Sequence, residues 1–176
     1  LVGSEMCIRD RFYSYVKERG LEQAAHGVYV SPDTWTDAMY ILHLRCSQAV
    51  FSHETALFFH DLTDREPLKY TITVRTGYNP SRLQEDGFQV YTVKKDLHET
   101  GITIMQTPFG HSVPVYDMER TICDLLRNRN NIEMQVFQDA LKQYVRRKDK
   151  NLRTLMKYAS MFHVEKILRP YLEVLL

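Results

Sequence analysis

The C-terminal part of the chain carries its apolar residues at the spacing of α-helices. Apolar positions recur three and four residues apart, and polar residues fill the positions between them. Asp117 precedes the first segment of this kind and Glu119 falls in its first turn, as expected at a helix N-terminus. The segments with this pattern are about 117–126, 132–145, 152–159 and 164–175. They predict a bundle of amphipathic helices.

The middle of the chain alternates between apolar and polar positions and is rich in β-branched and aromatic residues, which predicts strands. Ser52 is a suitable N-cap for a helix that runs to about His60, and another apolar helical stripe lies within residues 36–46. Pro114 has no backbone N–H, so we expect its strand at an edge of the sheet. The predicted strands are 49–51, 70–74, 88–93, 102–105 and 113–115. The fold class is therefore α/β (α+β), with a small mixed sheet packed with a C-terminal helical bundle.

The N-terminal part has a different pattern. Residues 12–19 predict a short helix that ends at Gly20, which tolerates the left-handed conformation of a C-cap. Two short extended pieces follow, one on each side of Gly27. A helix followed by a small hairpin is the arrangement at the end of a winged helix-turn-helix. We expect residues 12–32 to be the remnant of such a domain and residues 33–176 to form the main domain.

The first eleven residues, LVGSEMCIRDR, differ in character from the rest. Residues 4–11 closely resemble translated sequencing-adapter DNA, a known contaminant of predicted genes. We therefore expect residues 1–11 to be a disordered artefact. The true N-terminus would then be missing, together with the first two helices of the winged helix-turn-helix.

Composition limits the classes of protein that the chain can belong to. Hydrophobic residues make up 44% and charged residues 26%, which is typical of a globular protein. The net charge of +1 excludes a polybasic chain that binds nucleic acid over its whole surface. No apolar run is long enough to span a membrane, and no signal peptide is apparent, so we expect a soluble, cytoplasmic protein. Three cysteines without C-x-x-C spacing indicate neither a disulfide framework nor a zinc site.

Two acid–histidine pairs, His53–Glu54 and His60–Asp61, are the strongest indication of catalysis. In the zinc-protease motif H-E-x-x-H the second histidine follows the first by four residues, but that position is Leu57. A seven-residue separation places the two histidines about 10.5 Å apart along a helix, too far to share one metal ion. The histidines are therefore interpreted as structural.

Other catalytic motifs are also missing from the sequence. Cys123 lies beside Asp124, whose negative charge disfavours the thiolate. The sequence contains no G-x-S-x-G, G-x-G-x-x-G or P-loop motif. We expect no catalytic residue, no metal, no cofactor and no enzymatic activity. A metal-dependent nuclease assembled from distant acidic residues is kept as an alternative.

Basic residues gather where the second helix of the predicted bundle meets the third. Such cations are common at a solvated helix C-terminus, where the helix dipole favours them. Cations spaced across one turn also suit contact with the phosphates of a nucleic acid. An alternative function is therefore a nucleic-acid-binding or nuclease-like module that uses this turn. The residues are Arg146, Arg147, Lys148, Lys150, Arg153 and Lys157.

The segment from Tyr116 to Leu126 carries more charge than a simple core helix needs. Arg120 and Asp124 are four residues apart and can pair along the helix, which contributes a few tenths of a kcal/mol at a surface. In an alternative interpretation, Glu119 and Arg120 orient the loop at 108–110. The residues interpreted as a structural motif are Ser52, His53, Asp117, Glu119, Arg120 and Asp124.

Several blocks of this sequence are similar to the AbiEi antitoxins of bacterial type IV toxin–antitoxin systems, which act in abortive infection and phage defence. The resemblance extends from about Phe12 to Leu176, and its most specific parts are S-H-x-x-A-L within residues 51–57 and E-R-T-I-C-D within residues 116–125. The blocks that carry it are residues 27–29, 51–57, 60–63, 116–125 and 139–142.

The resemblance implies a two-part protein that is not an enzyme. Its N-terminal winged helix would bind operator DNA and repress the chain's own promoter. Its C-terminal domain would counteract a nucleotidyltransferase-like toxin without forming a stable complex, and the basic turn is a candidate antitoxicity surface. Because the first two helices are missing, we expect the chain to retain antitoxicity but to bind operator DNA poorly. The candidate DNA-binding residues are Tyr13, Ser14, Lys17, Arg19 and His26.

Overall fold

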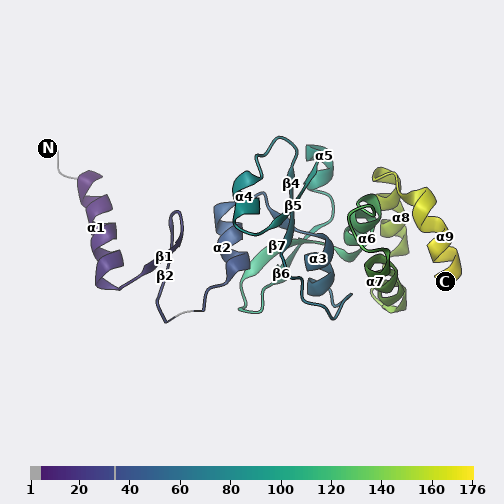
Figure 1. Cartoon of the computed structure of the whole chain (residues 1–176), viewed down its shortest axis with the longest axis horizontal. Helices are drawn as coiled ribbons and strands as arrows, with labels where there is room; N and C mark the ends of the chain where they lie inside the picture. Colours follow the sequence, from purple (N-terminus) through teal and green to yellow (C-terminus); the bar gives the residue numbers. More distant parts are fainter. Residues whose placement is uncertain (1–4, 34) are drawn as a thin grey trace. The chain divides into compact units, whose positions relative to one another are not determined.

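The computed structural model describes residues 5–33 and 35–176, which divide into two compact units (Figure 1). The N-terminal unit comprises the described residues up to Ser47 together with Gln106–His111, and the sheet unit comprises the remainder. None of the described helices is both long and apolar enough to cross a membrane.

The N-terminal unit contains helix α1, a β-hairpin and helix α2. Helix α1 ends in a glycine cap: Gly20 has a φ of +61°, and the amide of Leu21 donates to the carbonyl of Val16 at 2.9 Å. The ring of Phe12 contacts the ring of Tyr29 edge-on at 5.2 Å. The elements are α1 (Glu5–Glu18), β1 (Glu22–Ala25), β2 (Val28–Val30) and α2 (Ala38–Arg45), with β1 and β2 antiparallel.

Helix α1 begins earlier than the sequence pattern predicts. We expected residues 1–11 to be disordered, but residues 5–11 belong to α1; residues 1–4 lie outside the described residues. The segment 5–11 contains no Gly or Pro and includes Glu, Met and Arg, which are good helix formers, so the helix extends through it. The predicted order of helix and hairpin is present, although this order alone does not define a winged helix-turn-helix.

The sheet unit is built on a mixed five-stranded sheet with strand order β5-β4-β3-β7-β6. Strand β3 pairs antiparallel with β4 and parallel with β7, while β4 pairs parallel with β5. The strands are β3 (Val50–Phe51), β4 (Thr71–Arg75), β5 (Gln89–Val93), β6 (Ile102–Gln106) and β7 (Ser112–Tyr116). The predicted α+β class with a small mixed sheet is confirmed.

The expected edge position of Pro114 is wrong. Its strand β7 lies between β3 and β6, and Pro114 is buried. Strand β3 is only two residues long, and its single registered pair with β7 joins Phe51 to Val115. Because β3 is so short, β7 makes few ladder hydrogen bonds to it, and the missing N–H of Pro114 is tolerated.

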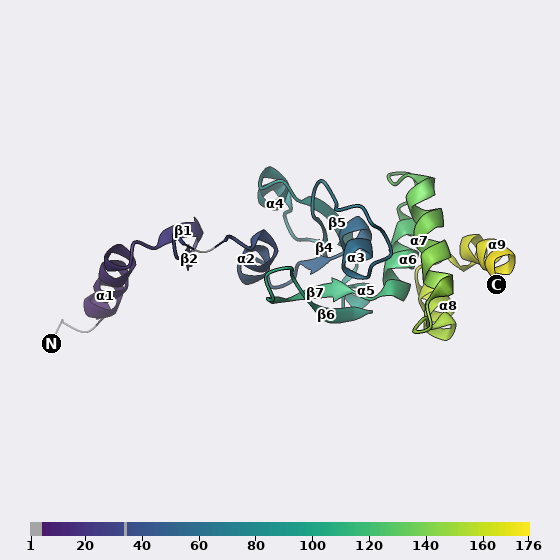
Figure 2. The same cartoon turned by 90° about the horizontal axis from the view of Figure 1, so that it is seen from below.

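Four helices form the predicted C-terminal bundle, and Figures 1 and 2 show them gathered on one side of the sheet. Helix α6 contacts α3, α7 and α8. The bundle helices are α6 (Met118–Arg127), α7 (Met134–Arg146), α8 (Leu152–Met161) and α9 (Glu165–Leu175). The shorter helices are α3 (His53–Phe59), α4 (Ser81–Glu85) and α5 (Lys95–His98). The predicted apolar stripes of α6–α9 supply most of one continuous core.

Candidate functional site

Arg120 lies at the centre of the sheet unit and is fully buried. Its Nε donates to Asp124 Oδ2 at 2.9 Å, and its Nη1 donates to the carbonyls of Leu97 and Thr100 at 2.7 and 2.8 Å. Asp124 is also buried, and burial raises the pKa of its carboxyl while the neighbouring guanidinium opposes that rise. The predicted pair between Arg120 and Asp124 is thus present, but it is an interior ion pair and not a surface one.

Two aromatic rings enclose the guanidinium of Arg120. Its carbon Cζ lies 4.0 Å from the ring centre of Tyr116 and 4.2 Å from that of Phe162. Such stacking compensates part of the lost hydration of a buried cation. The side chain therefore joins α5, β7, α6 and the end of α8, and it does not face an open cavity.

Glu119 is buried beside Arg120 and connects helices α6, α7 and α8. Its Oε1 accepts from the hydroxyl of Tyr144 at 2.8 Å and from the amide of Asn151 at 2.9 Å. Asn151 is the N-cap of α8, and its side chain accepts from the amide of Thr154. These bonds and those of Arg120 are made to segments other than 108–110.

Asp117 caps α6 as predicted. Its Oδ1 accepts from the amide of Arg120 at 2.7 Å, and burial raises the pKa of its carboxyl to about 6. Gly101 packs against this cap with a φ of +77°, and its carbonyl accepts from the amide of Asp117 at 2.7 Å. A Cβ at Gly101 would lie 2.8 Å from the Cβ of Arg120, so the close approach requires glycine.

Ser52 and His53 belong to a second buried network. His53 has a φ of +49°, and its Nδ1 lies 3.0 Å from Ser52 Oγ, which accepts from Thr73 Oγ1 at 2.8 Å. Asn128 donates to His53 Nε2 at 2.9 Å, and the ring of Tyr91 stacks on the imidazole at 3.9 Å. Burial, followed by the charge of Arg120, lowers the pKa of His53 to about 3, so the ring is neutral.

The N-cap position predicted for Ser52 is confirmed, but its side chain bonds elsewhere. Ser52 occupies the N-cap position of α3, but its side chain makes no capping hydrogen bond to the helix. Its hydroxyl is engaged by His53 and Thr73, because β4 lies directly beside the end of β3. The cap position followed from local sequence, whereas the bonding partner comes from a neighbouring strand.

His60 does not join His53 in a metal site. Its Nε2 donates to the carbonyl of Tyr116 at 2.7 Å, and burial lowers the pKa of the ring. Among the described residues, no group of three or more His, Cys, Asp or Glu side chains is placed to hold a metal ion. His60 therefore connects the end of α3 to the end of β7.

Two of the six cations at the basic turn (residues 146–157) form hydrogen bonds that hold the turn, and the other four are exposed. Arg147 donates through Nε and Nη2 to the two carboxylate oxygens of Asp149, at 2.8 Å each, and through Nη1 to the carbonyl of His60 at 3.0 Å. Lys150 donates to the carbonyl of Arg147 at 3.0 Å. These two residues hold the turn in place. The exposed cations are Arg146, Lys148, Arg153 and Lys157.

The candidate DNA-binding residues all lie at the surface of the N-terminal unit. Four of them are on α1 or directly after it, and the fifth is in the turn of the β1–β2 hairpin. Arg19 also lies 5.7 Å from the ring centre of Tyr15, a cation–π contact. The residues are Tyr13, Ser14, Lys17, Arg19 and His26, and each is exposed.

A polar cluster that the sequence did not indicate lies in the N-terminal unit. Asp37 is buried, and its Oδ2 accepts from Thr107 Oγ1 at 2.6 Å and from His111 Nδ1 at 2.8 Å. Its Oδ1 accepts from the amides of Met39 and Tyr40, which makes it the N-cap of α2. Asp37 before an apolar helix is a signal for a cap, but partners seventy residues away leave no local signal.

The fold and its buried networks define a two-unit α+β protein whose charged motif residues act as internal connectors. No known protein family matches the chain, and no curated protein shows significant similarity to it.

Proposed function

We propose that the chain is the antitoxin of a bacterial type IV toxin–antitoxin system and that its N-terminal unit contributes to binding operator DNA. The observation that supports this most is the position of the two blocks with the most specific resemblance to AbiEi antitoxins. Residues 51–57 and 116–125 lie against each other in the sheet unit, and most of their side chains are buried. Similarity in residues that determine packing argues for a shared fold and not for a chance surface motif.

We also propose that the chain is not an enzyme. Two charged side chains of these blocks are held by internal bonds: Arg120 by Asp124 and two carbonyls, and Glu119 by Tyr144 and Asn151. Residues engaged in this way support a scaffold. Antitoxicity would then depend on exposed surfaces, of which the cations of the basic turn are the leading candidates.

Growth rescue tests the antitoxin proposal. The gene next to this one, which the proposal expects to encode a nucleotidyltransferase-like toxin, would be expressed from one plasmid and this chain from another, with colony counts as the readout. We expect co-expression to restore growth. Normal toxicity in the presence of the folded, expressed chain would refute the proposal.

Charge reversal tests the proposed antitoxicity surface. A variant with Arg146, Lys148, Arg153 and Lys157 changed to Glu removes exposed cations without touching a bonded one. A control variant with Lys94 and Lys95 changed to Glu alters exposed cations elsewhere in the sheet unit. We expect only the first variant to lose rescue. Loss of RNA binding or of metal-dependent cleavage, with rescue unchanged, would favour the nucleic-acid module.

The DNA-binding part of the proposal is tested with a promoter fragment. Phosphate contacts make affinity fall steeply with salt, so band shifts at low and physiological salt report their contribution. We expect weak binding by this chain and further loss in Lys17→Glu/Arg19→Glu. Tight, sequence-specific binding that persists at physiological salt would contradict the expected loss of operator binding.

A further inference from the structure

Strand β6 is the last strand of the sheet in the described part of the chain, so one of its two edges has no neighbouring strand there. The short loop 107–111 joins it to β7, which makes the two strands antiparallel. The amide of Asp117 donates to the carbonyl of Gly101 at 2.7 Å just before β6, and the amide of Thr107 donates to the carbonyl of His111 at 2.8 Å just after it. These two bonds fix which backbone groups of β6 face β7.

The backbone groups of every second residue of β6 point away from β7. In an antiparallel pair, hydrogen-bonded positions alternate with positions whose amide and carbonyl face outwards. Gly101 and Thr107 are hydrogen-bonded positions, so the odd-numbered residues between them also face β7. Each even-numbered residue therefore offers one amide and one carbonyl to a further strand. The outward positions are Ile102, Ile104 and Gln106.

The side chains at this edge are apolar and partly uncovered. Ile104 is 64% exposed and Ile102 is 38% exposed. The residues opposite them on β7 are buried; they are Pro114 and Tyr116. Directly opposite residues of an antiparallel pair lie on the same face of the sheet, so the buried face of β7 continues onto β6 and reaches solvent there. A further strand would cover it.

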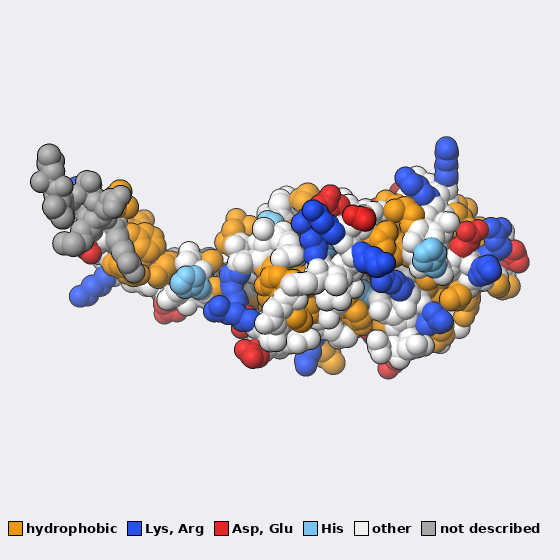
Figure 3. All heavy atoms as spheres, turned by 90° about the horizontal axis from the view of Figure 1, so that it is seen from above, with side chains coloured by type: hydrophobic (Ala, Val, Ile, Leu, Met, Phe, Trp, Pro, Cys, Tyr) orange, Lys and Arg blue, Asp and Glu red, His pale blue; other side chains and the backbone are white. Residues whose placement is uncertain are grey.

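Strand β6 lacks the usual protection of an edge strand. Natural edge strands are commonly kept from pairing with other chains by a charged residue, a proline or a bulge. The sequence of β6, ITIMQ, contains no charged residue and no proline. The surface of the bundle differs, since basic, acidic and apolar side chains are mixed there (Figure 3, right).

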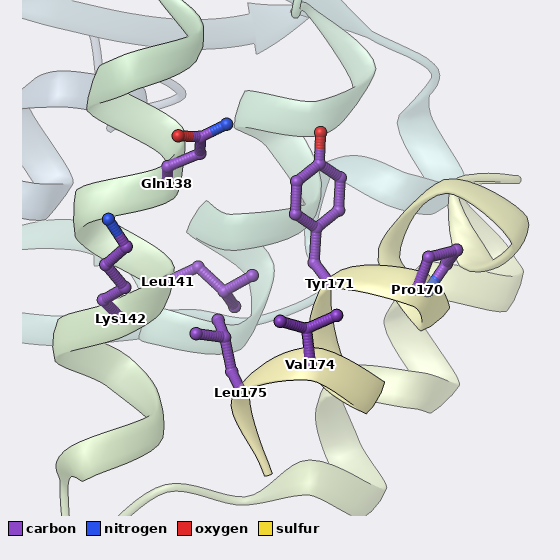
Figure 4. Close-up of a pocket in the computed structure, with 7 residues that line it drawn as sticks. All are labelled: Gln138, Leu141, Lys142, Pro170, Tyr171, Val174 and Leu175. Atoms are coloured by element: carbon purple, nitrogen blue, oxygen red, sulfur yellow. The ribbon is translucent and has the colours of Figure 1, made fainter.

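The backbone of β6 also specifies the kind of occupant, which an apolar surface alone does not. Figure 4 shows an apolar groove between α7 and α9, where Leu141 points towards Val174 and Leu175. The backbone groups of these helices are bonded within each helix, so the groove selects no particular partner. The outward amides and carbonyls of β6 require an extended strand.

The strand that matches this edge is β6 of a second copy. When two β6 strands meet antiparallel about a two-fold axis at Ile104, this residue lies opposite its counterpart and Ile102 lies opposite Gln106 of the copy. Every outward position then faces an outward position, so all outward amides and carbonyls of both strands find partners. The strand is uncharged, so the copy brings no like-charge repulsion, and the two Ile104 side chains form a β-branched cross-strand pair.

We propose that the chain forms a two-fold dimer in which two β6 strands pair antiparallel at Ile104 and join the two sheets. This pairing consumes the β6 edge of both copies, so the assembly closes at two chains. A pair of five-residue strands is a small interface, and we expect a dimer that dissociates on dilution. The inference is independent of the proposed antitoxin function.

Sedimentation equilibrium of the full chain over a range of concentrations tests the inference. We expect a monomer–dimer equilibrium whose dissociation constant rises about tenfold or more in Ile104→Lys, because two like charges would face each other at the two-fold axis. Ile104→Glu should act in the same way. An equimolar mixture of the two variants should restore the dimer, since opposite charges then meet. Only a register that places residue 104 against its counterpart predicts this restoration.

A matched variant separates edge pairing from a general effect of charge. Thr92 is exposed on β5, the strand at the other edge of the sheet, so Thr92→Lys should leave the dissociation constant unchanged. Circular dichroism would verify that each variant is folded. A monomer at every concentration, an unchanged dimer in folded Ile104→Lys, or no dimer in the mixture would overturn the inference. Assemblies larger than a dimer would also overturn it, because β6 would then pair without the two-fold register.

Discussion

Replacing Arg120 by Met tests whether the ion pair on α6 is the interior connector that the structure describes. Methionine keeps much of the length of the side chain and removes the guanidinium. Asp124 would then be a buried carboxylate without its partner, and the carbonyls of Leu97 and Thr100 would lose their donor. The stacking between Tyr116 and Phe162 would be reduced to ordinary apolar contact.

The expected magnitude depends on where the pair lies. Removing one partner of a buried pair costs about 3–5 kcal/mol, because the remaining charge is left without compensation. An exposed pair contributes only about 0–1 kcal/mol. Both side chains here are at most 4% exposed, so we expect the larger loss. For a chain of this length it corresponds to a fall in Tm of about 6–20 °C.

Urea denaturation followed by circular dichroism measures this loss from the shift of the midpoint at constant m. Arg169→Met is the matched control, because Arg169 pairs with Glu165 at the same spacing but at the surface, with 59% and 35% of the side chains exposed. The double variant Arg120→Met/Asp124→Leu should recover part of the stability, since no charge is then left buried. A loss below about 1 kcal/mol in Arg120→Met would refute the reasoning.

The free energy of unfolding should fall as the pH is lowered from 7 to 6, because burial holds the pKa of His53 at about 3 and the unfolded chain binds this proton first, near 6.5. The slope from His53 averages about 0.7 kcal/mol per pH unit between pH 7 and 6 and rises towards about 1.4 at lower pH. Urea midpoints should show less of this dependence in His53→Gln. Below pH 6 the carboxyl of Asp117 raises the free energy of unfolding as the pH falls, because its pKa is raised to about 6 and the folded chain binds that proton first. Asp117→Asn removes this gain and should therefore steepen the acid-induced loss of stability. An unchanged profile would contradict this. Gly101→Ala should lower the urea midpoint more than Gly110→Ala does. Both glycines have a positive φ, but only a Cβ at Gly101 would meet Arg120. Equal losses would show that this close contact is unimportant.

The longer helices could be predicted because their apolar stripes repeat over several turns. Helices α6 to α9 each contain at least ten residues, enough for the period of 3.6 to stand out. Helices α4 and α5 contain five and four residues, fewer than two turns, so the pattern did not reveal them. Helix α1 starts earlier than predicted because residues 5–11, although they resemble translated adapter DNA, include good helix formers.

The structural role of the charged motif could be inferred from the sequence, but its partners could not. The spacing of Arg120 and Asp124 indicates a pair on one helix face, and Asp117 is a recognisable cap. The carbonyls that Arg120 binds belong to the segment around α5, and the ring of Phe162 follows α8. Such contacts depend on how distant segments pack, which periodicity does not encode.

By itself, the sequence determined the local features of this protein: the amphipathic helices, the alternating strands, the glycine cap at Gly20 and the N-cap at Asp117. These features depend on hydrogen bonds and side-chain spacing within a few residues. Only the tertiary structure decided that Pro114 lies in an interior strand, that the Arg120–Asp124 pair is buried, and that Asp37 binds His111. The physical reason is that the burial of a group and its bonding partners are set by segments that are remote in sequence.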